Sequence, residues 1–141
     1  MRAVRQLIVF ALAFLAVGSI DSQEPSISVA EAKSLVAIVL RHQQFPLSSP
    51  YCEIEHLDKE GKPFAPDYYS FGAHCDFPNT AARSPWGTYL VSPRTGDVLE
   101  FNLCKWFRYA DLRRMQKQIM LRTHTTEVTE AQYREKTGCG K

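Results

Sequence analysis

The sequence lacks several features that define large classes of protein. It has no unbroken apolar run of the roughly 20 residues that a membrane-spanning helix needs. It has no G-x-x-x-x-G-K-[ST], G-x-G-x-x-G, G-x-S-x-G or H-E-x-x-H motif. It also has no strong excess of one charge, with 17 Lys and Arg against 15 Asp and Glu. Nucleotide binding therefore has no support, and a nucleic-acid partner is not expected, because nucleic-acid binding needs clustered positive charge.

The composition that remains is that of one globular domain. The chain has 141 residues, of which 45% are hydrophobic, 11% aromatic and 23% charged. A chain of this length buries roughly two-thirds of its unfolded surface, which is enough for a stable core. The same balance excludes a disordered tail protein, a collagen-like chain and a protein with several membrane spans.

The N-terminus has the order of parts found in a secretory signal peptide. Arg2 and Arg5 precede an unbroken apolar stretch at residues 7–17, and Gly18 and Ser19 follow it. We expect residues 1–22 to be this signal, with cleavage after Ser19 or Ser22. Residues 23–141 then form a single small α+β domain without a stable membrane anchor, located in the periplasm or secreted.

The cysteines favour disulfide bonds. All four (Cys52, Cys75, Cys104 and Cys139) lie after the predicted signal, and an even count in an exported chain is typical of disulfides. Three pairings are possible. We prefer Cys52–Cys75, because their strands are expected to be neighbours, which leaves Cys104–Cys139. The cysteines and histidines lack the close spacing of a zinc site, so no metal and no cofactor is expected.

The periodicity of the chain predicts a helix followed by a sheet. Ser28 and Glu31 have the spacing of a capping box, and the apolar residues after them repeat with a helical period, which predicts a helix over residues 29–43. Alternation of apolar and polar residues predicts four strands, at residues 51–57, 68–77, 86–91 and 98–102. The last two are expected to form a hairpin around a turn at residues 92–97.

The C-terminal part is expected to be helical. Asp111 is a candidate cap for a helix running to about residue 122, and residues 129–132 are suited to open a short third helix that Gly138 ends. The tail, residues 137–141, is expected to be mobile unless Cys139 is bridged. The fold class is therefore α+β, with an N-terminal helix packed on a four-stranded antiparallel sheet, followed by one or two C-terminal helices.

One short segment resembles a known type of domain. Residues 87–100, GTYLVSPRTGDVLE, resemble the hairpin of small exported bacterial domains of PepSY-type or cystatin-like architecture. The helix ahead of the sheet is similar to those families as well. The resemblance implies a non-catalytic binding or inhibitory domain, with no catalytic residues to carry over.

Catalytic interpretations rest on a few polar residues of the first two strands. His74 and Asp76 share one face of a strand, and Glu53 or Glu55 is expected to be near them, which defines a small exported hydrolase as an alternative function. No motif surrounds these residues. A solvated strand face explains the glutamates more simply.

We therefore predict an exported, non-enzymatic binding domain, such as a periplasmic inhibitor or an immunity-type protein that binds another exported protein. An envelope structural or accessory protein is a further alternative. Contact with the partner is expected from the loops at residues 58–67, 78–85 and 92–97, because recognition often lies on loops held by a rigid sheet. The expected binding residues are polar or aromatic side chains in or near these loops and strands: Tyr68, Trp86, Arg94 and Trp106.

Overall fold

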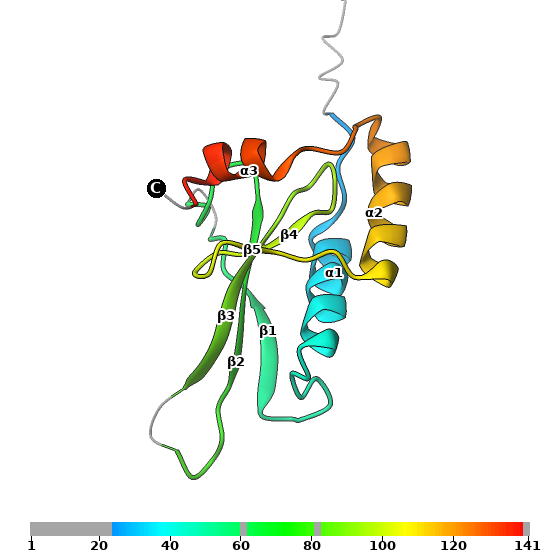
Figure 1. Ribbon diagram of the computed structural model, residues 1–141. Coiled ribbons are helices and arrows are strands. Elements are labelled where there is room, and N and C mark those ends of the chain that lie inside the picture. The colour runs from blue at the N-terminus through cyan, green and yellow to red at the C-terminus, as the bar shows by residue number, and fades with distance from the viewer. Residues whose placement is uncertain (1–23, 60–61, 81–82, 140–141) are drawn as a thin grey trace, which may run out of the picture.

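A computed structural model describes residues 24–59, 62–80 and 83–139 (Figure 1). The predicted signal peptide at residues 1–22 lies outside the described residues. The elements follow one another as α1 (Val29–His42), β1 (Cys52–His56), β2 (Tyr69–Cys75), β3 (Ser84–Val91), β4 (Val98–Glu100), β5 (Lys105–Trp106), α2 (Ala110–Thr123) and α3 (Glu130–Thr137). The α+β class and the helix-first order are those predicted from the sequence.

The strands form one antiparallel sheet in chain order, β1-β2-β3-β4-β5. The predicted β3–β4 hairpin and the β1–β2 pairing are both confirmed. The prediction of four strands was one too few, because β5 has only two residues and pairs with β4 through Leu99↔Trp106 and Glu100↔Lys105. A strand of two residues is too short to produce a visible alternation of apolar and polar side chains. The third strand begins at Ser84, two residues earlier than predicted.

Helix α1 forms because its capping box and its apolar stripe agree. The Ser28 side chain accepts a hydrogen bond from the Glu31 backbone N–H, and the Glu31 carboxylate accepts one from the Ser28 N–H. The stripe is fully buried against the sheet, and burying each such Leu or Val contributes about 1.5–3 kcal/mol; it comprises Leu35, Val36, Val39 and Leu40.

Helix α2 lies beside α1, on the same face of the sheet (Figure 1). Its N-cap is Tyr109, which makes no side-chain capping bond, so the prediction of Asp111 as the cap was wrong. Asp111 lies in the first turn instead, where its carboxylate accepts from the Leu112 N–H and lies 3.0 Å from His42 Nε2 of α1. The contact joins the last turn of α1 to the first turn of α2.

The opposite face of the sheet carries a second, smaller core at the end near α3. Leu90, Leu99 and Cys139 form it, with Tyr68 and Trp106 packed against them. Disulfides join Cys52 to Cys75 and Cys104 to Cys139, which is the pairing that the sequence analysis preferred. The second bond attaches the segment after α3 to the chain between β4 and β5. Cys139 is accordingly buried rather than part of a free tail.

Among the residues described, no helix has both the length and the apolar character that crossing a membrane requires.

The turn between β3 and β4 depends on one glycine. Gly96 has a φ of +70°, which favours glycine, and a Cβ placed there would lie 2.7 Å from Ile119 Cδ1 of α2 and 3.1 Å from Leu35 Cδ1 of α1. Its carbonyl accepts a hydrogen bond from the amide of the fully buried Gln116. The turn is therefore pressed against both long helices at their junction.

We expect Gly96→Ala to lower the free energy of unfolding by about 2–4 kcal/mol, because it adds a clash in a packed core to the cost of a positive φ. Gly138→Ala is the matched control, because Gly138 has the same φ of +70° but no atom within 4 Å of the added Cβ. Its cost should be about 1 kcal/mol. Urea unfolding of both variants measures the difference. Equal losses would show that the contacts with Ile119 and Leu35 do not matter.

Candidate binding surface

The half of the open sheet face away from α3 is polar. In β1, Ile54 is buried toward the helices, so alternation directs Glu53 and Glu55 to the opposite face. In β2, Ala73 lies in the core, and His74 points to the same face as the two glutamates. The register pairs Glu53 directly with His74. Sheet geometry thus places side chains from two strands together.

The polar side chains on this face form a connected set. His74 is only 4% exposed, and its Nε2 lies 2.9 Å from Glu53 Oε1 and 3.8 Å from Asp76 Oδ2. Arg83, just before β3, places Nη1 3.0 Å from Glu55 Oε2 and Nε 3.4 Å from Asp76 Oδ1. We call Glu53, Glu55 and Asp76 the carboxylate cluster. Their side chains are 46–62% exposed.

This arrangement bears on both catalytic and metal chemistry. The hydrolase alternative needs His74 paired with Asp76, but their separation is beyond hydrogen-bond distance, and His74 bonds to Glu53 instead. Single ligand atoms of Glu53, Glu55 and His74 lie within 4.8 Å of one another, which suits a divalent cation. Arg83 already places a positive charge against this group. Both features are consistent with a surface that attracts cationic groups.

Exposed aromatic side chains lie at the same end of the sheet. Tyr51 precedes β1, Phe77 follows β2 and Trp86 lies near the start of β3; they are 48%, 41% and 46% exposed. The rings of Tyr51 and Phe77 have centroids 6.1 Å apart, and Trp86 meets edge-on, at 5.3 Å, the ring of Phe45, a buried residue of the main core on the helix side of the sheet. We call Tyr51, Phe77 and Trp86 the aromatic group. The irregularity in register between Ala73 and His74 lies opposite Trp86.

The disulfide Cys52–Cys75 lies between these two sets. Its Cα atoms are 4.0 Å apart, and the two residues are register partners in the β1–β2 ladder. Tyr51 and Glu53 flank one cysteine, whereas His74 and Asp76 flank the other. The bond therefore holds the strand ends that carry the carboxylate cluster and much of the aromatic group. We call this end of the molecule, where the β2–β3 hairpin projects in Figure 1, the hairpin end.

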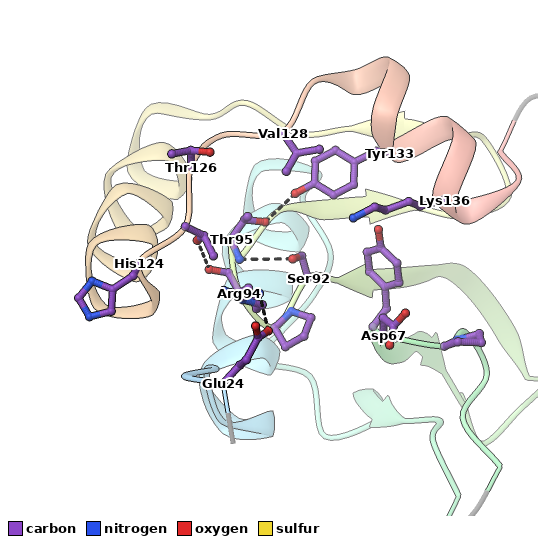
Figure 2. Close-up of a pocket in the computed structure, with 14 residues that line it drawn as sticks. Glu24, Asp67, Ser92, Arg94, Thr95, His124, Thr126, Val128, Tyr133 and Lys136 are labelled. Atoms are coloured by element: carbon purple, nitrogen blue, oxygen red, sulfur yellow. Dashed lines mark hydrogen bonds and ion pairs between the residues drawn. The ribbon is translucent and has the colours of Figure 1, made fainter. Parts of the chain in front are cut away.

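A cavity of about 740 Å³ lies at the other end, between the β3–β4 turn, the N-terminal segment and α3 (Figure 2). Arg94 forms an ion pair with Glu24, and its backbone carbonyl accepts hydrogen bonds from the hydroxyls of Thr123 and Thr125. Thr95 bonds to the hydroxyl of Tyr133 at 2.6 Å. The buried Nε of Arg94 has no hydrogen-bond partner among the described residues, whereas its Nη1, its carbonyl and the hydroxyl of Thr95 each have one.

Tyr133 attaches α3 to the sheet. Its hydroxyl donates to the carboxylate of the buried Asp97, and its ring lies 4.3 Å from that of Trp106. Burial raises its pKa, and the charge of Asp97 adds to this effect. The same two causes, burial first, raise the pKa of Tyr68, which also lines the cavity, to about 12. Both phenols are therefore uncharged at neutral pH.

The four residues predicted to bind a partner do not form one surface. Tyr68 and Arg94 line the cavity, and Trp106 packs under α3 against Tyr133. Trp86 alone of the four lies at the hairpin end. Sequence reasoning did not single out Tyr51 and Phe77 as contact residues, because an aromatic residue at a strand end has the same local pattern whether it is exposed or packed.

These features describe a class of protein: a small disulfide-bonded α+β domain with exposed aromatic and acidic side chains suited to binding another protein. Comparison with protein families places it further. The model of the family described as "T6SS, Immunity protein Tgi2PP" matches residues 26–131, and the chain belongs to this family. It is thus a non-enzymatic immunity-type protein that acts by binding another protein.

A solved structure is also similar. It is described as "Structure of a type VI secretion system effector-immunity complex from Pseudomonas protegens" and matches with a TM-score of 0.74 and 33% sequence identity. The match covers 84% of this chain and 94% of that chain. No curated protein matches the sequence.

The family match overturns the resemblance to PepSY-type and cystatin-like domains. That resemblance rested on residues 87–100 alone. Two strands joined by a turn containing Thr-Gly-Asp have similar sequences in many folds, because the turn geometry selects those residues. The inhibitory function that it implied agrees with the immunity family, although the relationship was wrong.

The loop after β1 is held by one carboxylate. Asp58 accepts hydrogen bonds from the backbone N–H groups of Phe64 at 3.0 Å and Ser70 at 2.9 Å, and lies 3.1 Å from His56 Nε2. Partial burial acts to raise the pKa of Asp58, but these N–H donors outweigh it, so the pKa lies below its usual value. The charged form therefore holds the loop against the second core.

We expect Asp58→Asn to lower the free energy of unfolding by about 1–2 kcal/mol at pH 7, because the charged acceptor is lost. A lowered folded-state pKa means that the carboxylate stabilises the fold above about pH 4 and loses this effect as the pH falls through the folded pKa. The difference between wild type and variant should therefore shrink by pH 3. Urea unfolding at both pH values measures it. A constant difference would contradict the role of the charge.

Proposed function

We propose that this chain is a periplasmic immunity protein that binds and neutralises an effector of a type VI secretion system. Membership of the family over residues 26–131 carries the proposal. Similarity to a chain of an effector–immunity complex, over 94% of that chain, supports it. On this proposal the partner is itself an exported protein, delivered by the secretion system.

Two features of the chain support the location. The predicted signal at residues 1–22, cleaved after Ser19 or Ser22, would export residues 23–141 as one domain. Both disulfides fit an oxidising compartment such as the periplasm. On this proposal, the immunity protein is in the compartment into which the effector is delivered.

Neutralisation by binding sets a requirement on affinity. A protein that performs no chemistry protects only while it occupies its partner, so the complex must outlast the exposure to the effector. Affinities of this kind come mainly from slow dissociation and depend on a few well-packed side chains. The exposed aromatic group supplies side chains of the right type.

A competition experiment tests the function and the location together. Recipient cells that lack this chain are mixed with sister cells that have an active type VI secretion system. We expect the recipients to lose viability, and residues 1–141 expressed in them to restore it. A version without residues 2–22 should not protect, because it would remain in the cytoplasm. Colony counts of the recipients measure each outcome.

Attacking cells with an inactive secretion system serve as the control. Equal survival of recipients with and without the chain would contradict the immunity function. Protection by the version without residues 2–22 would contradict only the periplasmic location. Thiol alkylation of the periplasmic protein without reductant should leave all four cysteines unlabelled, as the two disulfides require.

A further inference from the structure

We infer that the hairpin end is the surface that contacts the effector, and that the effector presents to it a basic patch beside an apolar pocket. The inference rests on the proposed function and adds to it the contact residues and the chemistry of the partner's surface. The aromatic group would enter the apolar pocket, and the carboxylate cluster would face the basic patch.

The first argument is the distribution of exposed apolar side chains. Eight large apolar side chains are exposed among the described residues. Three of them, Tyr51, Phe77 and Trp86, lie at the hairpin end. The other five lie on other elements: Val29 on α1, Leu47 after α1, Phe64 in the loop after β1, Leu103 after β4 and Leu121 on α2. Gathered apolar side chains mark interaction sites, and Trp and Tyr contribute most to binding energy.

The second argument is charge. The carboxylate cluster sets three carboxylates against the single guanidinium of Arg83. The chain as a whole is nearly balanced in charge, so this excess of negative charge is local. Because all three carboxylates are half exposed, their ion pairs with Arg83 are weak, and a partner's Lys or Arg could replace Arg83 at little cost. A basic partner surface is the complementary one.

The third argument is rigidity. The Cys52–Cys75 bond fixes the strand ends at the hairpin end, and the buried His74 holds the carboxylate of Glu53 in place. A surface that is already ordered before binding loses less conformational entropy on forming a complex. The disulfide therefore serves the affinity of this surface as well as the stability of the sheet.

The cavity at the other end is a weaker candidate for the contact. Arg94 pairs with Glu24 through Nη1 and with Thr123 and Thr125 through its carbonyl, and its buried Nε alone is left without a partner among the described residues. The Tyr133 hydroxyl is held by Thr95 and Asp97. A partner entering there would have to break contacts that hold α3 and the N-terminal segment in place.

The test uses the effector that co-purifies with the wild-type chain from the periplasm of the attacked recipients, identified and then produced alone. Its association and dissociation are measured by surface plasmon resonance against purified variants. Trp86→Ala and Phe77→Ala should each raise the Kd about 30-fold, mainly through faster dissociation. Phe77 contacts the exposed Tyr51 rather than the core, so its variant keeps the fold even if Trp86→Ala is destabilised.

The charge is tested separately. Glu53→Gln with Glu55→Gln keeps the shape of both side chains, and the amide of the first can still bond to His74. We expect the association rate at low salt to fall about tenfold and to depend less on salt concentration. Matched controls are Leu121→Ala for exposed apolar area and Glu130→Gln with Glu135→Gln for charge. These should bind within about twofold of wild type.

The outcomes separate the two claims. Weaker binding by both sets of hairpin-end variants, with unchanged controls, would support the inference. If those variants bind like wild type while Tyr68→Ala or Arg94→Ala weakens binding, the contact lies at the cavity and the inference is overturned. If the wild-type chain captures no effector, the proposed function itself fails and the inference falls with it.

Discussion

Both long helices, α1 and α2, pack on one face of a five-stranded sheet, and the rest of the structure follows from how the other face is covered. The apolar stripe of α1 and the residues of α2 around Ile119 make the main core with β2, β3 and β4. Short elements cover the open face over only part of its area. Helix α3 buries Tyr133 alone among its residues, so the Cys104–Cys139 bond and the Tyr133–Asp97 contact hold it in place. The uncovered remainder carries Glu53, Glu55 and His74 and lies at the hairpin end.

The sequence predicted those elements of the fold that are determined by contacts between residues close together in the chain. Ser28 and Glu31 determine the start of α1 through contacts three residues apart, and the alternation in β1 and β2 was visible without tertiary information. The sequence also led to an immunity-type binding function, through size, cysteines and the absence of catalytic motifs. Strand β5 was missed because two residues carry no period.

The candidate surface was harder to predict than the fold. Trp86 and Trp106 have similar strand surroundings in sequence, yet Trp86 is exposed and Trp106 packs against Tyr133, a residue 27 positions further along the chain. The difference arises from α3 crossing one end of the sheet, which no local pattern encodes. Likewise, Glu53 and Glu55 were expected on a solvated strand face. Their contacts with His74 and Arg83 depend on strand register and on the start of β3.

The position of β1 at the edge of the sheet affects how the unbound protein can associate with copies of itself. An exposed edge strand offers unpaired backbone groups to any other strand, including the edge strand of a second copy of the same protein. Strand β1 has only five residues, carries Glu53 and Glu55 on its outer face, and is covalently fixed to its neighbour at Cys52. At the other edge, β5 has only two residues. Short, charged and fixed edges discourage edge-to-edge pairing, so the same carboxylates and disulfide that shape the hairpin end would also oppose self-association of the unbound protein.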